Sequence, residues 1–166
     1  MKLLIHIILP VTALFIACGG SEESNDDSAE TIPVPPSAVE LPGTLIAPTG
    51  DTLEVHPGVT VVVYYWLPLE LYEEAADDLL YLSSLGDGFL PLPVQPDHEA
   101  RNHAQTIVND LEISLPVYLA DSVFMKSLDC AILPVCMVIH SDGHTMWADG
   151  FGSPERLLSD SPSEEP

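Results

Sequence analysis

The sequence predicts an α/β domain in which helices cover a central sheet. Over residues 59–128, β-branched and aromatic runs alternate with segments of helical periodicity. Hairpin patterns precede and follow this region, at residues 44–55 and 135–149. The chain has 166 residues, so we expect a single core, because a second one would not fit beside the targeting and linker segments described below.

The first 17 residues have the layout of an export signal. They combine one positive residue, Lys2, with an apolar run that ends in Ala17 immediately before Cys18. The run is short for a spanning helix, which needs ~20 apolar residues. The sequence LFIAC at residues 14–18 resembles the lipobox of bacterial lipoproteins. This resemblance implies that Cys18 is acylated, becomes the mature amino terminus and anchors the exported protein to a membrane, facing the periplasm or the cell surface.

The segment after Cys18 is predicted to be a tether. Residues 19–30 are acidic and small without apolar periodicity, and residues 31–42 are rich in proline. Neither composition favours a packed core. The predicted organisation is therefore a signal peptide at residues 1–17, a tether at 18–43, the domain at 44–160 and a flexible tail at 161–166.

The first half of the domain is predicted to contain a hairpin, a buried strand and a helix. Residues 44–47 and 52–55 flank a Pro-Thr-Gly-Asp turn and predict the hairpin. Residues 59–66 (VTVVVYYW) are β-branched or aromatic almost throughout, as expected for a strand buried on both faces. Residues 70–85 carry apolar side chains at spacings of four, four and three, which predicts a helix ending at two glycines.

The second half continues this alternation and ends in a hairpin and a helix. Asp97 is the expected cap of one helix, whereas the last helix should have Ser153 as its cap and Pro154 at its first position. The predicted elements are strands at residues 89–95, 115–120, 135–140 and 145–149, and helices at residues 97–110, 122–128 and 153–159.

This order of elements resembles the thioredoxin fold as found in thiol-disulfide lipoproteins and peroxiredoxin relatives. Residues 128–143 (LDCAILPVCMVIHSDG) are similar to the family's segment around its cis-proline, with Leu133-Pro134 at the proline and Asp142-Gly143 at the following hairpin turn. The resemblance implies a three-layer sandwich with a central mixed sheet and flanking helices. It also implies that the Leu133–Pro134 peptide bond is cis.

A second stretch carries the resemblance and shows where the family's chemistry is missing. In residues 61–75, Tyr65-Trp66 match the aromatic pair that precedes the family's Cys-x-x-Cys motif, and Glu70 and Glu73 stand where the two cysteines belong. Thiol-disulfide exchange needs an attacking thiolate and a resolving thiol, and glutamate supplies neither. The resemblance therefore implies a domain without oxidoreductase activity. A calcium-type site at the two glutamates is the weaker interpretation, because hard cations want six or more oxygen ligands.

Two cysteines remain in the domain, Cys130 and Cys136, and the sequence leaves three interpretations open. They are small buried side chains, or they form a disulfide, which an exported compartment permits. In the third interpretation Cys136 is a redox-active or metal-binding thiol beside the cis-proline. The sequence shows no cationic neighbour that would activate it.

The histidines give only weak metal-ligand spacing. His98 and His103 are five apart on a predicted helix, and His140 and His144 flank a turn. A copper site of the kind found in thioredoxin-like copper chaperones would need a cysteine pair near the first helix, which this chain lacks. We therefore expect no metal and no cofactor.

The charge balance restricts the partners. Four Lys or Arg residues oppose 26 Asp or Glu residues, and the net charge of −22 repels nucleic acids. We expect a membrane-anchored binding or interaction module of the cell envelope, whose partners are the membrane, through the lipid, and an envelope protein. The alternatives are a thiol-dependent redox or peroxide-handling protein that uses Cys136, and a metal-binding envelope protein that uses the carboxylates and histidines.

Overall fold

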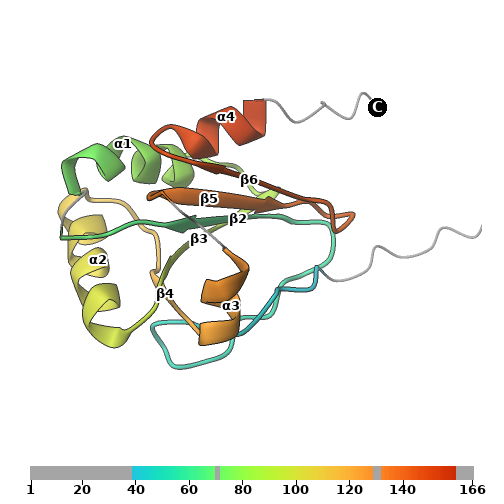
Figure 1. Cartoon of the computed structure of the whole chain (residues 1–166), viewed down its shortest axis with the longest axis horizontal. Coiled ribbons are helices and arrows are strands. Elements are labelled where there is room, and N and C mark those ends of the chain that lie inside the picture. The colour runs from blue at the N-terminus through green and yellow to red at the C-terminus, as the bar shows by residue number, and fades with distance from the viewer. Residues whose placement is uncertain (1–38, 70–71, 129–131, 160–166) are drawn as a thin grey trace, which may run out of the picture. The chain divides into compact units, whose positions relative to one another are not determined.

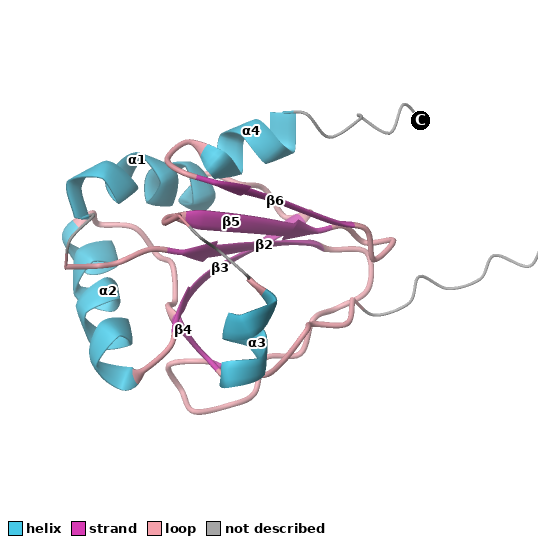
Figure 2. Cartoon of the chain, viewed as in Figure 1, coloured by secondary structure: helices cyan, strands magenta, loops and turns pink. Residues whose placement is uncertain are grey.

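The computed structural model describes residues 39–69, 72–128 and 132–159. In this part of the chain, six strands form one sheet in the order β1-β4-β3-β2-β5-β6, with helices on both faces (Figures 1 and 2). The strands are β1 (Leu45–Ile46), β2 (Thr60–Tyr65), β3 (Phe89–Gln95), β4 (Tyr118–Ala120), β5 (Val135–Ile139) and β6 (Thr145–Asp149). The helices are α1 (Tyr72–Ser83), α2 (His98–Asp110), α3 (Ser122–Ser127) and α4 (Ser153–Ser159).

The sheet is mixed, as predicted. β2 pairs with β3, and β3 with β4, in parallel. The pairs β1–β4, β2–β5 and β5–β6 are antiparallel. Parallel neighbours need a crossover, which α1 and α2 provide between β2, β3 and β4. β2 is therefore a central strand, and Val61 to Tyr64 are fully buried, which confirms that this strand is covered on both faces.

Two core clusters lie on opposite faces of the sheet because side chains alternate along each strand. Val62, Tyr64 and Trp66 enter a cluster with residues of α1, α2 and α4. Val61 and Val63 enter the other cluster, which contains Phe124 of α3. The helices α1, α2 and α4 pack on one face of the sheet and α3 packs on the other, which is the predicted three-layer sandwich (Figure 1).

Several predicted strands are shorter in the structure, two of them by three residues. The second strand of the first hairpin, expected at residues 52–55, is reduced to one bridge between Ile46 and Thr52. After that bridge, Leu53 and Val55 pack against the core cluster on the α3 side instead of continuing the ladder. β4 begins three residues later than predicted because the side chain of Gln105 binds the backbone there. Its amide donates to the carbonyl of Leu115 (3.2 Å) and accepts from the amide of Val117 (2.9 Å).

One of the two predicted helix caps is confirmed and the other is wrong. Asp97 caps α2, because its Oδ1 accepts a hydrogen bond from the amide of Ala100 at 2.9 Å. Ser153 is the first residue of α4 rather than its cap, and its buried Oγ has no hydrogen-bond partner among the described residues. The amide of the preceding Gly152 is bound by the Asp78 carboxylate instead, at 2.9 and 3.2 Å.

Residues 1–38, with the predicted signal peptide, Cys18 and most of the tether, lie outside the described residues. The lipid anchor therefore stays a prediction. None of the helices that the structure describes has the length and hydropathy needed to cross a membrane.

Candidate functional site

Three chain segments leave the sheet at one edge. Tyr65 of β2 pairs with Val135 of β5, which pairs with Asp149 of β6, so these residues lie side by side. Residues 66–69 follow β2, residues 132–134 precede β5, and residues 150–152 follow β6 (Figure 2). The resemblance places the degenerate motif, Glu70 and Glu73, directly after the first of these segments and the cis-proline in the second. We take this edge as the candidate site.

The Leu133–Pro134 bond is cis, the isomer that the resemblance implies. The carbonyl oxygen of Pro134 accepts a hydrogen bond from the amide of Gly150 at 2.8 Å. This bond joins the proline segment to the loop after β6. Gly150 and Gly152 have φ angles of 77° and 70°, in the left-handed region that favours glycine.

The two motif positions carry carboxylates. Glu73 is exposed in the first turn of α1, where acidic side chains favour the positive end of the helix dipole. Glu70 lies outside the described residues, as does Cys130. An exposed carboxylate in a first helical turn stabilises the helix without any catalytic role, so the position of Glu73 favours the interpretation of a scaffold residue.

A buried carboxylate, Asp78, lies beneath the site. Its Oδ2 accepts a hydrogen bond from the hydroxyl of Tyr64 at 2.8 Å, and the carboxylate also binds the amide of Gly152. Burial raises the pKa of Asp78, while the bonds from Tyr64 and Gly152 and the charge of Arg156 oppose the rise. Burial and the adjacent carboxylate also raise the pKa of Tyr64. Asp78 thus connects α1, β2 and the loop before α4, and we call Tyr64, Asp78 and Gly152 the buried network.

Arg156 of α4 holds the same loop from its other side. Its guanidinium donates to the carbonyl oxygens of Phe151 (2.6 Å) and Asp149 (2.7 Å). The loop after β6 is therefore fixed by a carboxylate, a guanidinium and the carbonyl of Pro134. This number of contacts indicates a preorganised surface at the site.

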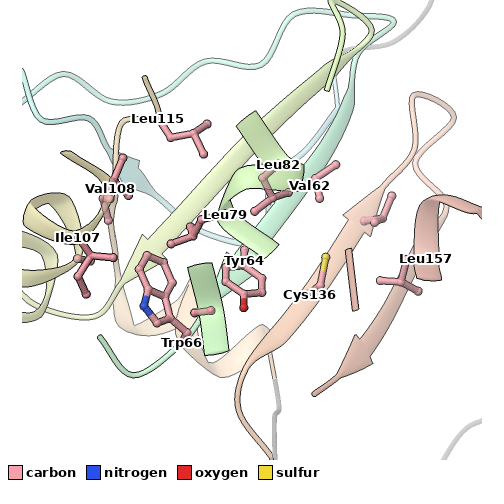
Figure 3. Close-up of a cluster of buried hydrophobic side chains, with 14 residues drawn as sticks. Val62, Tyr64, Trp66, Leu79, Leu82, Ile107, Val108, Leu115, Cys136 and Leu157 are labelled. Atoms are coloured by element: carbon pink, nitrogen blue, oxygen red, sulfur yellow. The ribbon is translucent and has the colours of Figure 1, made fainter. Parts of the chain in front are cut away.

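Aromatic packing supports the end of β2. The rings of Tyr64 and Trp66 stack with centroids 5.6 Å apart (Figure 3). Gln95, at the end of β3, donates from Nε2 to the carbonyl of Trp66 at 3.0 Å. Trp66 Nε1 and Gln95 Oε1 are buried without a hydrogen-bond partner in the described part of the chain. These contacts fix the backbone that leads into residues 67–69.

Cys136 lies in the interior of the domain. Its side chain is fully buried in the cluster shown in Figure 3, and it is a free cysteine. Burial, and then the charge of Asp78, raise the pKa of its thiol, which keeps it protonated. Sequence reasoning found no cationic neighbour, but the structure places Arg156 close enough to lower the pKa. Burial outweighs this effect, and together with the complete burial of the side chain this favours the interpretation of Cys136 as a small buried residue.

The surface of the site is apolar. Leu69 is 74% exposed, Ile132 58% and Phe151 39%, and each belongs to one of the three segments at this edge.

The described histidines do not form a metal site. His140 and His144 face each other across the β5–β6 turn with ring centroids 5.9 Å apart. In the described ranges no group of three or more His, Cys, Asp or Glu side chains could hold a metal ion.

Several solved structures are similar to this chain. A secreted disulfide oxidoreductase of Mycobacterium tuberculosis homologous to E. coli DsbE has a TM-score of 0.53 and 12% identity, covering 71% of this chain and 92% of that chain. A DsbF homologue from Corynebacterium diphtheriae has a TM-score of 0.53 and 20% identity, covering 71% and 83%. The thioredoxin domain of a thiol-disulfide oxidoreductase from Bacteroides vulgatus has a TM-score of 0.52 and 15% identity, covering 72% and 90%. The chain has a thioredoxin-like fold.

Identities at this level show the fold alone. No protein-family profile and no curated protein sequence matches the chain. The activity of this thioredoxin-like domain must therefore be argued from its own residues.

Sequence reasoning missed the buried network and Arg156. One signal for the network was present, because Asp78 stands three residues after Ala75 and four before Leu82, on the apolar stripe of α1. A carboxylate on such a stripe is buried and needs hydrogen-bond donors. The donors themselves come from Tyr64 and Gly152, 14 and 74 residues away, and no local pattern indicates them.

Proposed function

We propose that this thioredoxin-like domain has no thiol-disulfide oxidoreductase activity and acts as a protein-binding module of the cell envelope, anchored to a membrane through acylated Cys18. One observation carries the proposal. Cys136, the only cysteine in the described part of the chain, is buried with a raised pKa, whereas the exposed motif position carries Glu73. The exposed motif position therefore has no thiol, and the thiol of Cys136 is not accessible to a substrate.

The similar structures support an exported setting, and they differ from this chain in the activity that their names state. One of them is named as secreted, and two of the three reported above are named as a disulfide or thiol-disulfide oxidoreductase. Oxidoreductases of this kind need a nucleophilic and a resolving thiol in one accessible site. This chain has the same fold and an apolar edge of its own, but it has glutamate at both motif positions. A rigid apolar surface without a nucleophile is suited to binding.

The test of inactivity is insulin-disulfide reduction with dithiothreitol as electron source. The unmodified protein should give the background rate. Replacing both motif residues, Glu70→Cys with Glu73→Cys, should raise the rate above background, because the start of α1 then offers a thiolate and a resolving thiol. A matched control, Glu73→Cys alone, has no resolving thiol and should not turn over. If the unmodified protein reduces insulin or a peroxide, and Cys136→Ser abolishes the activity, the redox alternative is correct.

The anchor is tested separately. Intact-mass spectrometry of the membrane fraction should find a mature protein that begins at a lipid-modified Cys18. In Cys18→Ser the protein should no longer partition into the membrane. A mature protein without lipid, or unchanged partitioning of the serine variant, would contradict the anchor without affecting the argument about the thiols.

A further inference from the structure

We propose that a pocket between the loop after β2 and the first turns of α2 binds an apolar side chain of a partner protein flanked by lysine or arginine. The inference rests on the proposed function, because it names the chemistry of the partner that the binding module recognises. It adds a subsite with its own shape and charge to the apolar edge described above.

The walls of the pocket come from two elements. Leu67, Pro68 and Leu69 form one side, and Asp97, Glu99, Ala100 and His103 form the other. The pocket is open to solvent and has a volume of about 240 Å³. Pockets for drug-sized molecules span roughly 300–1,000 Å³, so this one is better matched to a single large side chain. The loop is held at its start, because Gln95 Nε2 donates to the carbonyl oxygen of Trp66 at 3.0 Å, immediately before Leu67.

Apolar contact supplies the anchor. Leu69 lines the pocket and is 74% exposed, and Leu67, Pro68 and Ala100 are the other apolar lining residues. A partner side chain placed here would cover Leu69 and remove apolar surface from water. Side chains that fill such pockets carry a large share of the binding energy of protein interfaces.

The acidic residues of the pocket, which we call its rim, determine which residues of the partner are favoured beside the apolar side chain. Asp97 and Glu99 are exposed carboxylates on the pocket wall, and no lysine or arginine lines it. Asp97 uses Oδ1 to cap α2, and a carboxylate can accept further bonds at its second oxygen. The three described lysine and arginine residues, Arg101, Lys126 and Arg156, all lie outside the pocket lining. The rim is therefore complementary to a basic segment.

The net charge of −22 argues against a second copy of this chain as the occupant. Two such molecules repel each other, and association is favoured for a partner of opposite sign. A basic peptide segment meets both requirements of the pocket, an apolar side chain for the walls and positive charge for the rim.

The probe is a fluorescein-labelled synthetic peptide with one leucine between two pairs of lysines, titrated with the purified protein and followed by fluorescence anisotropy. The protein should bind it, and binding should weaken as salt is added because rim ion pairs are screened. A peptide with serine in place of the leucine should bind at least about tenfold more weakly. A peptide with glutamates in place of the lysines should show no binding.

Two variants with the same charge change locate the site. Glu99→Lys reverses a charge at the pocket rim, whereas Asp110→Lys reverses an exposed charge at the far end of the same helix. Glu99→Lys should weaken binding by roughly tenfold and Asp110→Lys by less than about twofold, since only the first charge is close to the peptide. Ala100→Leu fills the pocket and should weaken binding of the leucine peptide but not of the serine peptide. Circular dichroism of each variant checks that the fold is retained.

The outcomes separate this inference from the proposed function. Equal weakening by Glu99→Lys and Asp110→Lys, or equal binding of the leucine and serine peptides, would mean general attraction to an acidic surface and would overturn the pocket. No binding of the lysine–leucine peptide would overturn it as well. Neither result changes the expected absence of insulin reduction, which tests the proposed function independently.

Discussion

The interior and the surface of the candidate site carry different chemistry. In the interior, the buried network and Cys136 contain a carboxylate, a phenol and a thiol, all packed beneath the sheet edge. On the surface, the exposed side chains offer apolar contact and one carboxylate; they are Leu69, Glu73, Ile132 and Phe151. The reactive groups are inaccessible, and the accessible groups are unreactive towards disulfides. The interior therefore stabilises this edge of the sheet, while the exposed residues are available for contacts with another molecule.

The largest expected difference between the two regions is in stability. Trp66→Ala should lower the free energy of unfolding by about 3–5 kcal/mol, because it empties a fully buried site stacked on Tyr64. Leu69→Ala, three residues further along the chain, should change it by less than about 0.5 kcal/mol. Urea denaturation of both variants measures the difference. Similar losses for the two would show that Leu69 belongs to the core and that the division is wrong.

The next effect comes from the buried network. Tyr64→Phe removes the hydroxyl that donates to Asp78 and leaves a buried carboxylate short of one donor. We expect a loss of about 1–3 kcal/mol in the free energy of unfolding. Tyr81→Phe on α1 is the matched control, since this tyrosine is only partly buried, and it should cost less than about 0.5 kcal/mol. If the two phenylalanine variants are equally stable, the bond from Tyr64 to Asp78 does not stabilise the site.

A smaller effect concerns pH. The pKa of Asp78 is raised in the folded protein, so the folded state holds this proton more tightly than the unfolded state does. The unmodified protein should therefore gain stability relative to Asp78→Asn as pH falls through the folded pKa of Asp78. The gain should level off below the ordinary aspartate value of about 4. Urea denaturation of both proteins over a pH series measures this difference. A difference that instead favours the unmodified protein as pH rises would mean that the network stabilises the ionised carboxylate.

The part of this fold that local chemistry determines could be predicted from the sequence. β3, β6 and α4 have the predicted bounds, and Asp97 caps α2 as expected. The cis bond at Leu133–Pro134 was implied by the resemblance of its surrounding segment. The strand and helix bounds and the Asp97 cap depend on residues a few positions apart, which is why a single sequence indicates them, whereas the cis bond came from the resemblance alone.

The part that depends on distant contacts could not be predicted. β4 is short because Gln105 occupies the backbone groups of Leu115 and Val117. Ser153 is not a cap because the carbonyl oxygen of Gly152 already accepts the first hydrogen bond of α4, from the amide of Arg156, and the Gly152 amide is held by Asp78. The pocket likewise combines Leu69 with Ala100, which only the folded chain brings together. The apolar stripe of α1 can be predicted from the sequence, but the hydrogen bonds that Tyr64 and Gly152 donate to Asp78 on that stripe cannot.

The absence of redox activity requires that the buried thiol of Cys136 be inaccessible to disulfides, and one measurement tests this directly. In a Cys18→Ser, Cys130→Ser protein, Cys136 is the only thiol, and its reaction with a chromogenic disulfide can be followed in native buffer and in denaturant. We predict that the native protein reacts only as fast as it unfolds, while the denatured protein reacts at the rate of a free thiol. Rapid reaction of the native protein would contradict the account, because it would show an accessible, ionisable thiol beside Pro134.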